Sequence, residues 1–528
     1  MTPRGVLLIL NRTPGATLRI ARRLEAEVPN VKVCGIVLER PQKTSNSVRT
    51  MLDRVRDLLL GLAHAFPVRP DDALEPSVDE FKQVCSRKAW PLLLVRSSDD
   101  ETVGNFVREC VADLGLVLGT ARIDSAVLGI PRQGFLRVNS VHVSAKGNAH
   151  VSSVGSPPEP TKQVRVAFEP TVDSKAAPSV ITFWLPGQPF DTPAGVAMKT
   201  ELISNDLMIK AVECLALGKA HEIPERLAAC TAEMLPACFD PEPCDGRTNL
   251  LDSSKWRTRP AWKLCLHTLV LFSPYVVARN WYRRWRGKFP VVILFHHLIS
   301  DRPHRMGIPT EIFLREVKFL QKCYRVVSLS EAMAILRSGS PEVPVVVLTF
   351  DDGYEDNFLN LRAVTEATGV PVSLFVCTTA VSAHEDFQHD RKNGQSGFRA
   401  LSWNQIRNWK SDQIEFGSHT RSHFDCGSPD IGRLEDEIVG SREDMGRQLG
   451  DRPRFFAFPW GKAKNMSSQA IEVASAKYEC SFSTLECENL PSEGNLPKVA
   501  GRKALPSTVW ELDLVVQSIF DLASRVRR

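Results

Sequence analysis

The most constraining feature of the sequence is an apolar run that ends in two adjacent carboxylates. Residues 344–348 are apolar without a break, as expected for a strand buried on both faces of a parallel sheet. Asp351 and Asp352 follow where this strand should end. Neighbouring carboxylates repel each other and lose hydration on burial, so a plain core would not retain them. The pair indicates either a metal or acid/base site, or an ordinary solvated Asp-Asp-Gly turn.

Two histidines four residues apart, His419 and His423, form a second feature. In one helical turn or a tight loop, both imidazoles can face one point. Together with a carboxylate from elsewhere, they would suit zinc or another divalent transition ion and leave coordination positions open for water and substrate. A pair of surface histidines is the alternative. A third feature is the aromatic stretch at residues 455–461, which predicts a rigid loop containing Pro459 and Trp460.

In their order and spacing, these stretches resemble the polysaccharide deacetylase (NodB-homology) family. The matching residues are 349–353, 418–423 and 456–461, within a region of agreement over about residues 288–510. The resemblance implies a distorted (β/α) barrel and metal-dependent removal of an N-acyl group from an amino sugar. It further implies that Asp352, His419 and His423 bind the metal and that Asp351 is the general base. Pro459 and Trp460 would then contact the substrate.

The general acid is harder to assign from the resemblance. Many family members use a late histidine, but no histidine follows His423. Some relatives supply the acid from a Tyr-His step on the first strand, and the matching step here is Phe295-His296. We therefore expect His296 to donate the proton, with His297 as second choice. The family's arginine before the Pro-x-Gly is absent, which leaves open what orients Asp351.

The first 222 residues alternate strand and helix patterns, as in a parallel sheet covered by helices. We expect strands over residues 5–10, 31–38, 92–95, 115–119, 163–168 and 179–185, and helices over 17–27, 47–64 and 100–114. This α/β region resembles the formyltransferase fold, through residues 118–123, 128–131 and 190–195.

A formyltransferase-like site would contain Asn139, His142 and Asp191. Active members carry Asn-x-His, whereas two residues separate Asn139 from His142 here. A regular strand would place these two side chains on opposite faces unless a bulge intervenes. The glycine that follows Asp-Thr in active members is Pro193. The alternative is a retained fold that serves binding or docking.

The sequence predicts three parts: a formyltransferase-like domain at 1–225, a linker at 226–285 and a deacetylase domain at 286–528. Residues 262–285 of the linker contain an apolar core at 264–278 that is too short and polar for a confident membrane span. Basic residues flank this core, and five tryptophans and tyrosines accompany it. Such a segment suits the headgroup region of an anionic membrane leaflet; the alternative is a helix packed between the two domains.

Composition and cysteine usage limit the partners and the compartment. The net charge of +5 on 528 residues is too small to argue for nucleic acid. Thirteen dispersed cysteines without a Cys-x-x-Cys are typical of reduced thiols. The first residues also lack the pattern of a signal peptide. We therefore expect a cytoplasmic protein, peripheral on the inner face of the membrane if residues 262–285 contact lipid.

The leading hypothesis is a metal-dependent N-deacylase, with zinc as the expected ion. Its substrate would be an N-acetyl or N-formyl amino sugar in a glycan, or a lipid- or nucleotide-linked sugar. One alternative is a formyl-transferring or bifunctional enzyme that uses a folate formyl donor. In a further alternative, the N-terminal domain is a non-catalytic docking module.

Overall fold

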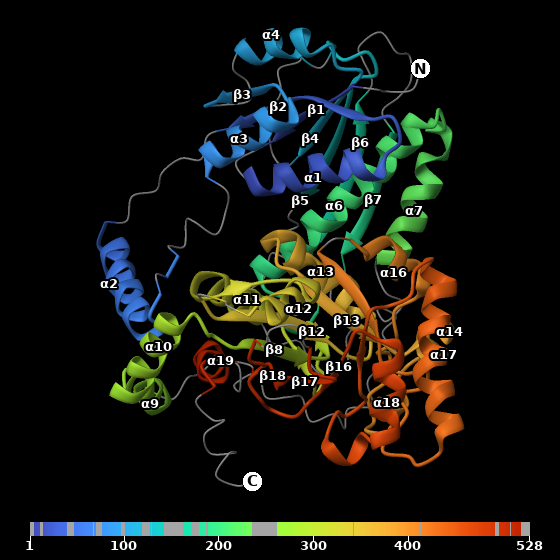
Figure 1. Cartoon of the computed structure of the whole chain (residues 1–528). Helices are drawn as coiled ribbons and strands as arrows, with labels where there is room; N and C mark the ends of the chain where they lie inside the picture. The colour runs from blue at the N-terminus through green and yellow to red at the C-terminus, as the bar shows by residue number, and fades with distance from the viewer. Residues whose placement is uncertain are drawn as a thin grey trace, which may run out of the picture. The chain divides into compact units, whose positions relative to one another are not determined.

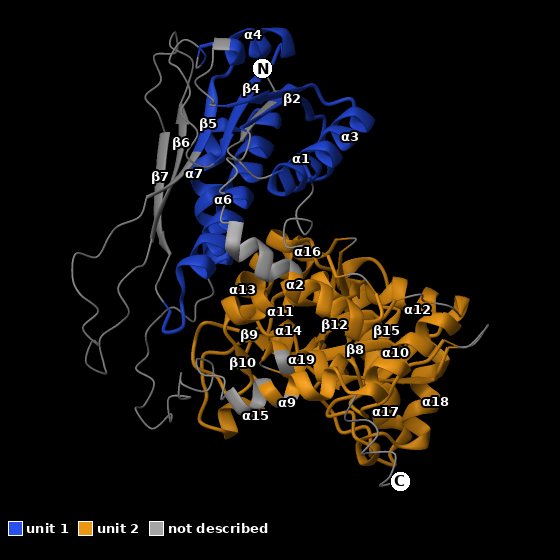
Figure 2. Ribbon diagram, turned by 90° about the vertical axis from the view of Figure 1, so that its left-hand side faces the viewer, with its two compact units in different colours: residues 1–46, 75–240 blue, residues 47–74, 241–528 orange. Residues whose placement is uncertain are grey.

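The computed structural model describes most of the chain and divides it into two compact units (Figure 2). The described residues are 5–10, 14–39, 47–66, 68–69, 77–96, 101–118, 127, 129–141, 162–169, 179–185, 188–234, 261–339, 341, 343–411, 413–491, 496–506 and 508–518. The first unit comprises residues 1–46 and 75–240, and the second comprises 47–74 and 241–528. Helix α2 (Ser47–His64) therefore belongs to the second unit, although elements of the first unit precede and follow it in the chain.

The first unit is built on a seven-stranded sheet in the order β3-β2-β1-β4-β5-β6-β7 (Figure 1). Its strands are β1 (Gly5–Leu10), β2 (Lys32–Glu39), β3 (Leu92–Val95), β4 (Leu114–Leu118), β5 (Phe135–Val141), β6 (Lys162–Glu169) and β7 (Ser179–Leu185). Its helices are α1 (Pro14–Glu27), α3 (Val78–Lys88), α4 (Glu101–Cys110), α6 (Pro193–Ala216) and α7 (Ile223–Met234). In this order the neighbouring strands β3, β2, β1, β4 and β5 pair in parallel. Strand β6 pairs antiparallel with both β5 and β7. The predicted α/β sheet is confirmed.

The second unit alternates strands and helices along the chain. Its strands are β8 (Val291–His296), β9 (Leu298–Ile299), β10 (Gly307–Ile308), β11 (Arg325–Val326), β12 (Val345–Phe350), β13 (Val372–Val376), β14 (Ile414–Ser418), β15 (Phe455–Ala457), β16 (Cys480–Ser483), β17 (Val499–Gly501) and β18 (Lys503–Ala504). Its other helices are α9 (Ala261–Leu271), α10 (Pro274–Arg286), α11 (Thr310–Cys323), α12 (Leu329–Ser338), α13 (Asp356–Thr368), α14 (Thr378–Ala383), α15 (Gln388–Lys392), α16 (Trp403–Trp409), α17 (Ile431–Leu449), α18 (Ser468–Lys477) and α19 (Val509–Val516).

The main sheet of this unit curls into a nearly closed barrel. The strands follow the order β17-β16-β15-β14-β13-β12-β8-β18, with β11 also paired to β12. Every pairing in this sheet is parallel. The two terminal strands of the order, β17 and β18, are separated in the chain by Arg502 alone, so the two edges of the sheet must lie close together. The predicted distorted (β/α) barrel is thereby confirmed.

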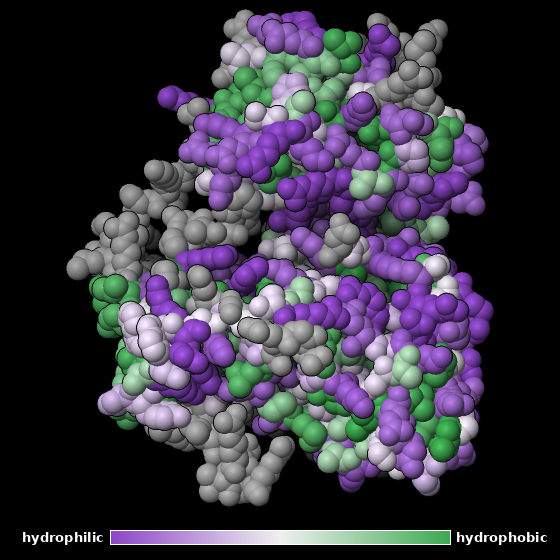
Figure 3. Space-filling view, in the orientation of Figure 1, coloured by the Kyte–Doolittle hydropathy of each residue, from purple (hydrophilic) through white to green (hydrophobic). Residues whose placement is uncertain are grey.

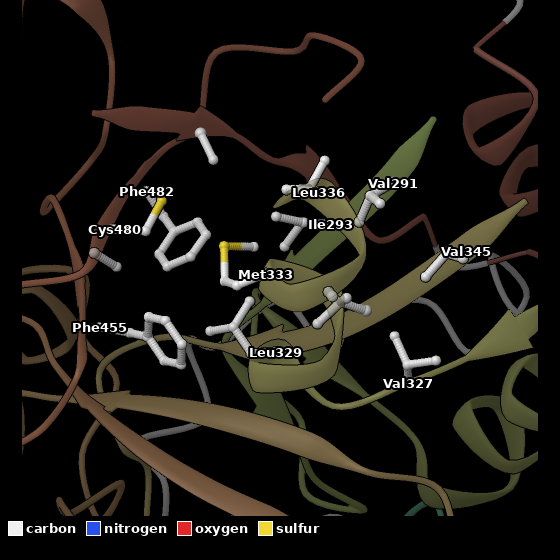
Figure 4. Packing of buried hydrophobic residues seen from close by; sticks show 14 of the residues in the cluster. Val291, Ile293, Val327, Leu329, Met333, Leu336, Val345, Phe455, Cys480 and Phe482 are labelled. Carbon is white, nitrogen blue, oxygen red and sulfur yellow. The ribbon is translucent and has the colours of Figure 1, made fainter. Parts of the chain in front are cut away.

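Buried apolar side chains from strands and from α12 form the core of the barrel (Figure 4). All six residues of β12 are buried, as the continuous apolar run predicted. Met333 of α12 packs among strand side chains that include Ile293 and Phe482. At Gly417, a Cβ atom would lie 2.5 Å from the Phe375 ring, so only glycine lets β14 approach β13 this closely.

The predicted segment at residues 262–285 forms two helices rather than one. Pro274 begins α10, and the Ser273 side chain accepts a hydrogen bond from the Val276 N–H as its N-cap. Gly287 ends α10 in the left-handed conformation. Among the residues that the structure describes, no helix combines the length and apolar character needed to cross a membrane.

Candidate active site

The candidate site lies where the parallel strands of the barrel end. Asp351 and Asp352 follow β12, His419 follows β14, and Arg502 follows β17. Because all strands of the sheet run in parallel, these carboxyl ends share one edge of the barrel, the edge at which such folds place catalytic groups. The buried strand that the sequence predicted therefore delivers both carboxylates to this edge.

Three of the predicted residues come together as a potential metal site. The Asp352 Oδ1 atom lies 3.6 Å from His419 Nε2 and 3.4 Å from His423 Nε2. One potential ligand atom from each of the three residues lies within 4.8 Å of the others. Two imidazole nitrogens and one carboxylate oxygen are a common ligand set for zinc, and this set leaves coordination positions open.

The hydrogen bonds around this cluster fit a divalent metal. His419 Nδ1 is 2.7 Å from the carbonyl oxygen of Ala457. That oxygen can only accept, so the proton is on Nδ1 and the Nε2 lone pair faces Asp352. Asp352 Oδ1 is buried and has no hydrogen-bond partner among the described residues. A buried carboxylate oxygen without a partner is costly, and a cation at this point would satisfy it.

Burial also keeps both histidines in the form that binds metal. Burial lowers the pKa of His419 to about 4, although the negative charge of Asp351 acts to raise it. For His423, burial and then the neighbouring His389 and His297 lower the pKa to about 3. Both imidazoles are therefore neutral near pH 7, which leaves nitrogen lone pairs for a metal.

The backbone at the site adopts unusual conformations. Asp352, Thr420, His423 and Trp460 have φ angles of 69°, 65°, 58° and 56°. Residues other than glycine seldom adopt this left-handed region, and such strain gathers at functional sites. Gly353 follows at φ 87°, and a Cβ atom there would lie 2.7 Å from Val376 Cγ1. The Asp-Asp-Gly turn therefore points two carboxylates into a crowded interior rather than into solvent.

Arg502 orients Asp351, and sequence reasoning missed this residue. Its NH1 and NH2 atoms donate to the two oxygens of Asp351 at 2.7 and 2.8 Å, and the arginine is fully buried. Burial alone would raise the pKa of Asp351, but Arg502 lowers it to about 2. The sequence does place an arginine between two short strands, yet only the closure of the barrel reveals its partner.

Strand β8 brings both candidate acids near Asp351. The His296 carbonyl accepts a hydrogen bond from the Asp351 N–H at 2.8 Å. Burial lowers the pKa of His296 to about 3, and its Nε2 atom has no described hydrogen-bond partner. His297 lies close enough to influence the pKa of both Asp351 and His423. The choice between these two acids stays a prediction.

A second group that sequence reasoning missed comes from residues 384–390. His389 Nε2 lies 3.8 Å from Asp352 Oδ2, and the His389 and His423 ring centroids are 5.6 Å apart. Tyr354 OH lies 2.7 Å from His389 Nε2 and donates to Asp390 Oδ2 at 2.6 Å. The polar composition of residues 378–400 predicted a loop at the barrel mouth, with His384 and His389 as solvated residues rather than ligands, and gave no sign that His389 would lie beside Asp352.

The loop after β15 supplies an aromatic wall. The rings of Trp460 and His423 lie 4.4 Å apart, and 49% of Trp460 is exposed. The predicted roles of Pro459 and Trp460 in substrate binding stay predictions.

The three N-terminal candidates are in different situations. Asn139 lies in β5 opposite Arg165 of β6, and His142 falls outside the described residues. The Asp191 side chain is 5% exposed, forms an ion pair with Lys199 and accepts a hydrogen bond from the Gln188 N–H at 2.7 Å. The carboxylate that would serve formyl transfer is thus held by an internal cation.

Comparisons with known proteins find similarity to parts of the chain. The family model for polysaccharide deacetylase matches residues 338–478. YxkH from Bacillus subtilis (strain 168), assigned as a polysaccharide deacetylase, is 22% identical over 182 residues, which are 34% of this chain and 60% of YxkH. This chain thus spans less than two thirds of that relative.

The similar solved structures include deacetylases and a transformylase. IcaB from Ammonifex degensii is 21% identical at a TM-score of 0.37, covering 43% of this chain and 97% of IcaB. The Streptococcus pyogenes deacetylase PplD in complex with acetate is 18% identical at a TM-score of 0.37, covering 44% and 98%. Glycinamide ribonucleotide transformylase 1 from Geobacillus kaustophilus is 10% identical at a TM-score of 0.25, covering 40% and 99%.

Proposed function

Since the C-terminal half of the chain contains a polysaccharide deacetylase domain, we propose that the protein hydrolyses an N-acyl group, acetyl or formyl, on an amino sugar of a glycan or glycoconjugate. The observation that carries this proposal is the cluster of Asp352, His419 and His423 with an unsatisfied carboxylate oxygen at its centre. Asp351 stands next to Asp352 in the chain and is held ionised by Arg502. A ligand set and a separate carboxylate base are what metal-assisted amide hydrolysis requires.

Asp352, His419 and His423 would hold a divalent ion, for which we propose zinc. Such an ion lowers the pKa of water and polarises an acyl oxygen. Asp351 accepts a proton from the water that attacks the acyl carbon, and the two hydrogen bonds from Arg502 fix its orientation. These bonds also lower its basicity, so Asp351 is poised as a carboxylate over the whole neutral range.

The leaving amine needs a proton before the carbon–nitrogen bond breaks. We assign this donor to His296, with His297 as the second choice. Trp460, half exposed beside His423, offers an aromatic face against which a sugar ring can pack. The amino sugar, its carrier and the acyl group are part of the proposal and define the substrates to be tested.

The direct experiment measures metal content and acyl release together. Replacing His419 or His423 with Ala should lower both, because three protein ligands fall to two. The substrates are a panel of N-acetyl and N-formyl amino sugars and their oligomers, with and without added zinc. His221→Ala, at an exposed position of the first unit, is the matched control and should change neither. Full metal content in the double variant His419→Ala/His423→Ala would contradict the site.

A further inference from the structure

Exposed apolar side chains of the described residues gather on three helices of the second unit. Of the fifteen large apolar side chains that are exposed, ten lie on α2, α9, α10 and the turn between α9 and α10. They are Val55, Leu58, Leu59, Leu62, Leu269, Phe272, Tyr275, Trp281, Tyr282 and Trp285. Leu269 is 72% exposed and Trp285 is 78% exposed. We call these residues the α2/α9/α10 surface; it is on the left in Figure 3.

The four members on α2 form a single stripe. Val55, Leu58, Leu59 and Leu62 follow the spacing i, i+3, i+4, i+7, which places them on one face of a helix. Such a stripe normally faces a core, but here each residue is at least 46% exposed. Ala63 and His64, at the end of the same helix, are instead fully buried. Helix α2 therefore has buried residues at its end and an exposed apolar stripe along its length.

Contacts on the inward side hold the helices firmly to the catalytic unit. The Asn280 side chain of α10 donates to the carbonyl of Ala63 at 3.0 Å, and the Trp281 indole donates to that of Leu62 at 3.3 Å. His64 and His267 both contact the buried carboxylate of Asp513, at 3.0 and 3.1 Å.

Two ion pairs add to this attachment. Lys322 pairs with Asp57 of α2 at 2.9 Å, and Arg283 of α10 pairs with Glu488 at 2.7 Å. These bonds join α2 and α10 to the rest of the unit at several points, so the outward face is a fixed surface.

In the α9 and α10 part of this surface the charge has one sign, whereas α2 also carries acidic residues, of which Asp57 is paired with Lys322. Residues 261–288 contain six lysines and arginines and no aspartate or glutamate. Arg286 and Lys288 are exposed at the end of α10, next to the exposed Trp285. Arg283 is paired with Glu488, so Arg286 and Lys288 are the exposed cations that a partner can meet. Apolar groups, indole and phenol rings and exposed cations are the combination that binds the headgroup region of an anionic bilayer.

We propose that the α2/α9/α10 surface binds an anionic lipid bilayer, so that the second unit lies on a membrane surface without crossing it. The charge also argues against a second copy of this chain as the occupant. A two-fold interface would bring the same cations of both copies together, where like charges repel. An anionic leaflet instead complements the cations and accepts the rings at the headgroup level.

The test is co-sedimentation of the full-length protein with vesicles. The two vesicle types are phosphatidylcholine alone and phosphatidylcholine mixed with phosphatidylglycerol. We expect binding to the anionic vesicles, weak binding to the neutral ones, and release as salt is raised. Each Lys or Arg near an anionic surface contributes about five-fold in binding, so Arg286→Glu/Lys288→Glu should weaken binding by roughly 30-fold or more.

A second variant tests the apolar part of the surface. Leu58→Ser/Trp285→Ser keeps all charges and should weaken binding to both vesicle types. The charge control is Lys477→Glu/Lys498→Glu, which makes the same change at two exposed positions elsewhere in the second unit, and the apolar control is Val111→Ser on the first unit. Both controls should bind as the unaltered protein does. Thermal unfolding of each variant shows whether it is folded.

Any of three results would overturn the proposal. The first is equal binding by the surface variants and their controls, and the second is no preference for anionic vesicles. The third is a concentration-dependent dimer that Leu58→Ser/Trp285→Ser dissociates, without vesicle binding by the unaltered protein, since the surface would then join two copies. None of these results bears on acyl release from a water-soluble amino sugar, which tests the proposed function separately.

Discussion

Two carboxylates that are adjacent in the chain have different surroundings in the fold. Asp351 receives two hydrogen bonds from Arg502, whereas Asp352 Oδ1 receives none from the described residues and faces two histidines. The alternation of side chains at the strand end and the left-handed φ of Asp352 separate them. This difference supports the proposed roles, Asp351 as the general base and Asp352 as a metal ligand.

Substitution of each carboxylate by the amide should separate these roles. Asp351→Asn should retain metal and lose roughly 10²–10⁴-fold in rate, the range for a general base. Asp352→Asn should instead lower the metal content, because an amide oxygen is a weaker ligand than a carboxylate. Metal analysis and acyl-release kinetics on both variants check this. The reverse pattern would exchange the two assignments.

Removing Arg502 should move the pH profile of the reaction. Burial favours the neutral form of Asp351, and Arg502 opposes it, so Arg502→Met should raise the pKa of Asp351. The acidic limb of kcat/KM should then shift to higher pH, while Arg502→Lys, which keeps the charge, should shift it less.

Stability provides a check on the same variant. Loss of one partner of a buried ion pair typically costs about 3–5 kcal/mol, so urea unfolding of Arg502→Met should show a marked loss. An unchanged acidic limb in a destabilised protein would reduce Arg502 to a structural role.

Three histidines with lowered pKa values make the metal-free protein sensitive to acid. Burial lowers the pKa of His419 to about 4, and of His423 and His296 to about 3. The unfolded chain binds these protons below pH ~6.5, whereas the folded protein does not, so stability falls as the pH is lowered from there towards 4.

The slope is at most about 1.4 kcal/mol per pH unit for each histidine. Urea unfolding of chelator-treated protein at several pH values from 7 to 4 measures this loss. His419→Ala/His423→Ala should give a shallower dependence. A pH-independent midpoint in the metal-free protein would show that the pKa values of these histidines are not lowered in the folded state.

At the scale of elements, strand β8 determines which histidine faces the reaction. Successive side chains of a strand point to opposite sides, so His296 and His297 cannot both face the same group while the strand is regular. The Phe295 and His297 rings lie 6.1 Å apart, and Arg502 lies over the Phe295 ring at 5.1 Å. Both histidines nevertheless interact electrostatically with Asp351.

A pair of substrates distinguishes the acid from a structural histidine. His296→Ala should severely slow hydrolysis of an N-acyl amine, since the amine leaves only when protonated, but largely spare an activated ester. The same pair of assays on His297→Ala provides the comparison. Equal loss on both substrates would indicate a structural role for His296, and unchanged amide hydrolysis would favour His297.

Sequence reasoning at this scale succeeded where one short pattern carries the information. The apolar run before Asp351 predicted a buried strand, and the spacing of His419 and His423 predicted that both rings could face one point. In the fold, Asp352 and these two histidines do lie together. The contact of Arg502 with Asp351 was missed because it forms only when the barrel closes. The position of His389 near Asp352 was missed because it depends on the path of an irregular segment. Neither feature leaves a periodic pattern in the sequence.

At the scale of the whole molecule, helix α2 departs most from what the sequence indicated. The pattern at residues 47–64 predicted a helix with the observed bounds, but among the N-terminal elements. Its partners, α10 and α11, lie more than two hundred residues further along the chain. Amphipathic periodicity shows that a helix has an apolar face, but not which distant surface that face meets.

The contacts of α2 predict that residues 241–528 alone are less stable than the whole chain. Without α2, Asp513 loses His64 and the Asn280 amide loses its acceptor at Ala63. The aromatic contact between Phe66 and Phe289 is lost as well. Each buried polar group left unpaired costs about 1–3 kcal/mol, so the shortened chain should unfold at markedly lower temperature and urea concentration than the second unit of the whole protein.

A peptide of residues 47–69 added in excess should restore part of this stability through binding, and the same peptide with His64→Ala should restore less. Equal stability of the shortened and full-length proteins, with no response to the peptide, would show that α2 is not an integral part of the second unit.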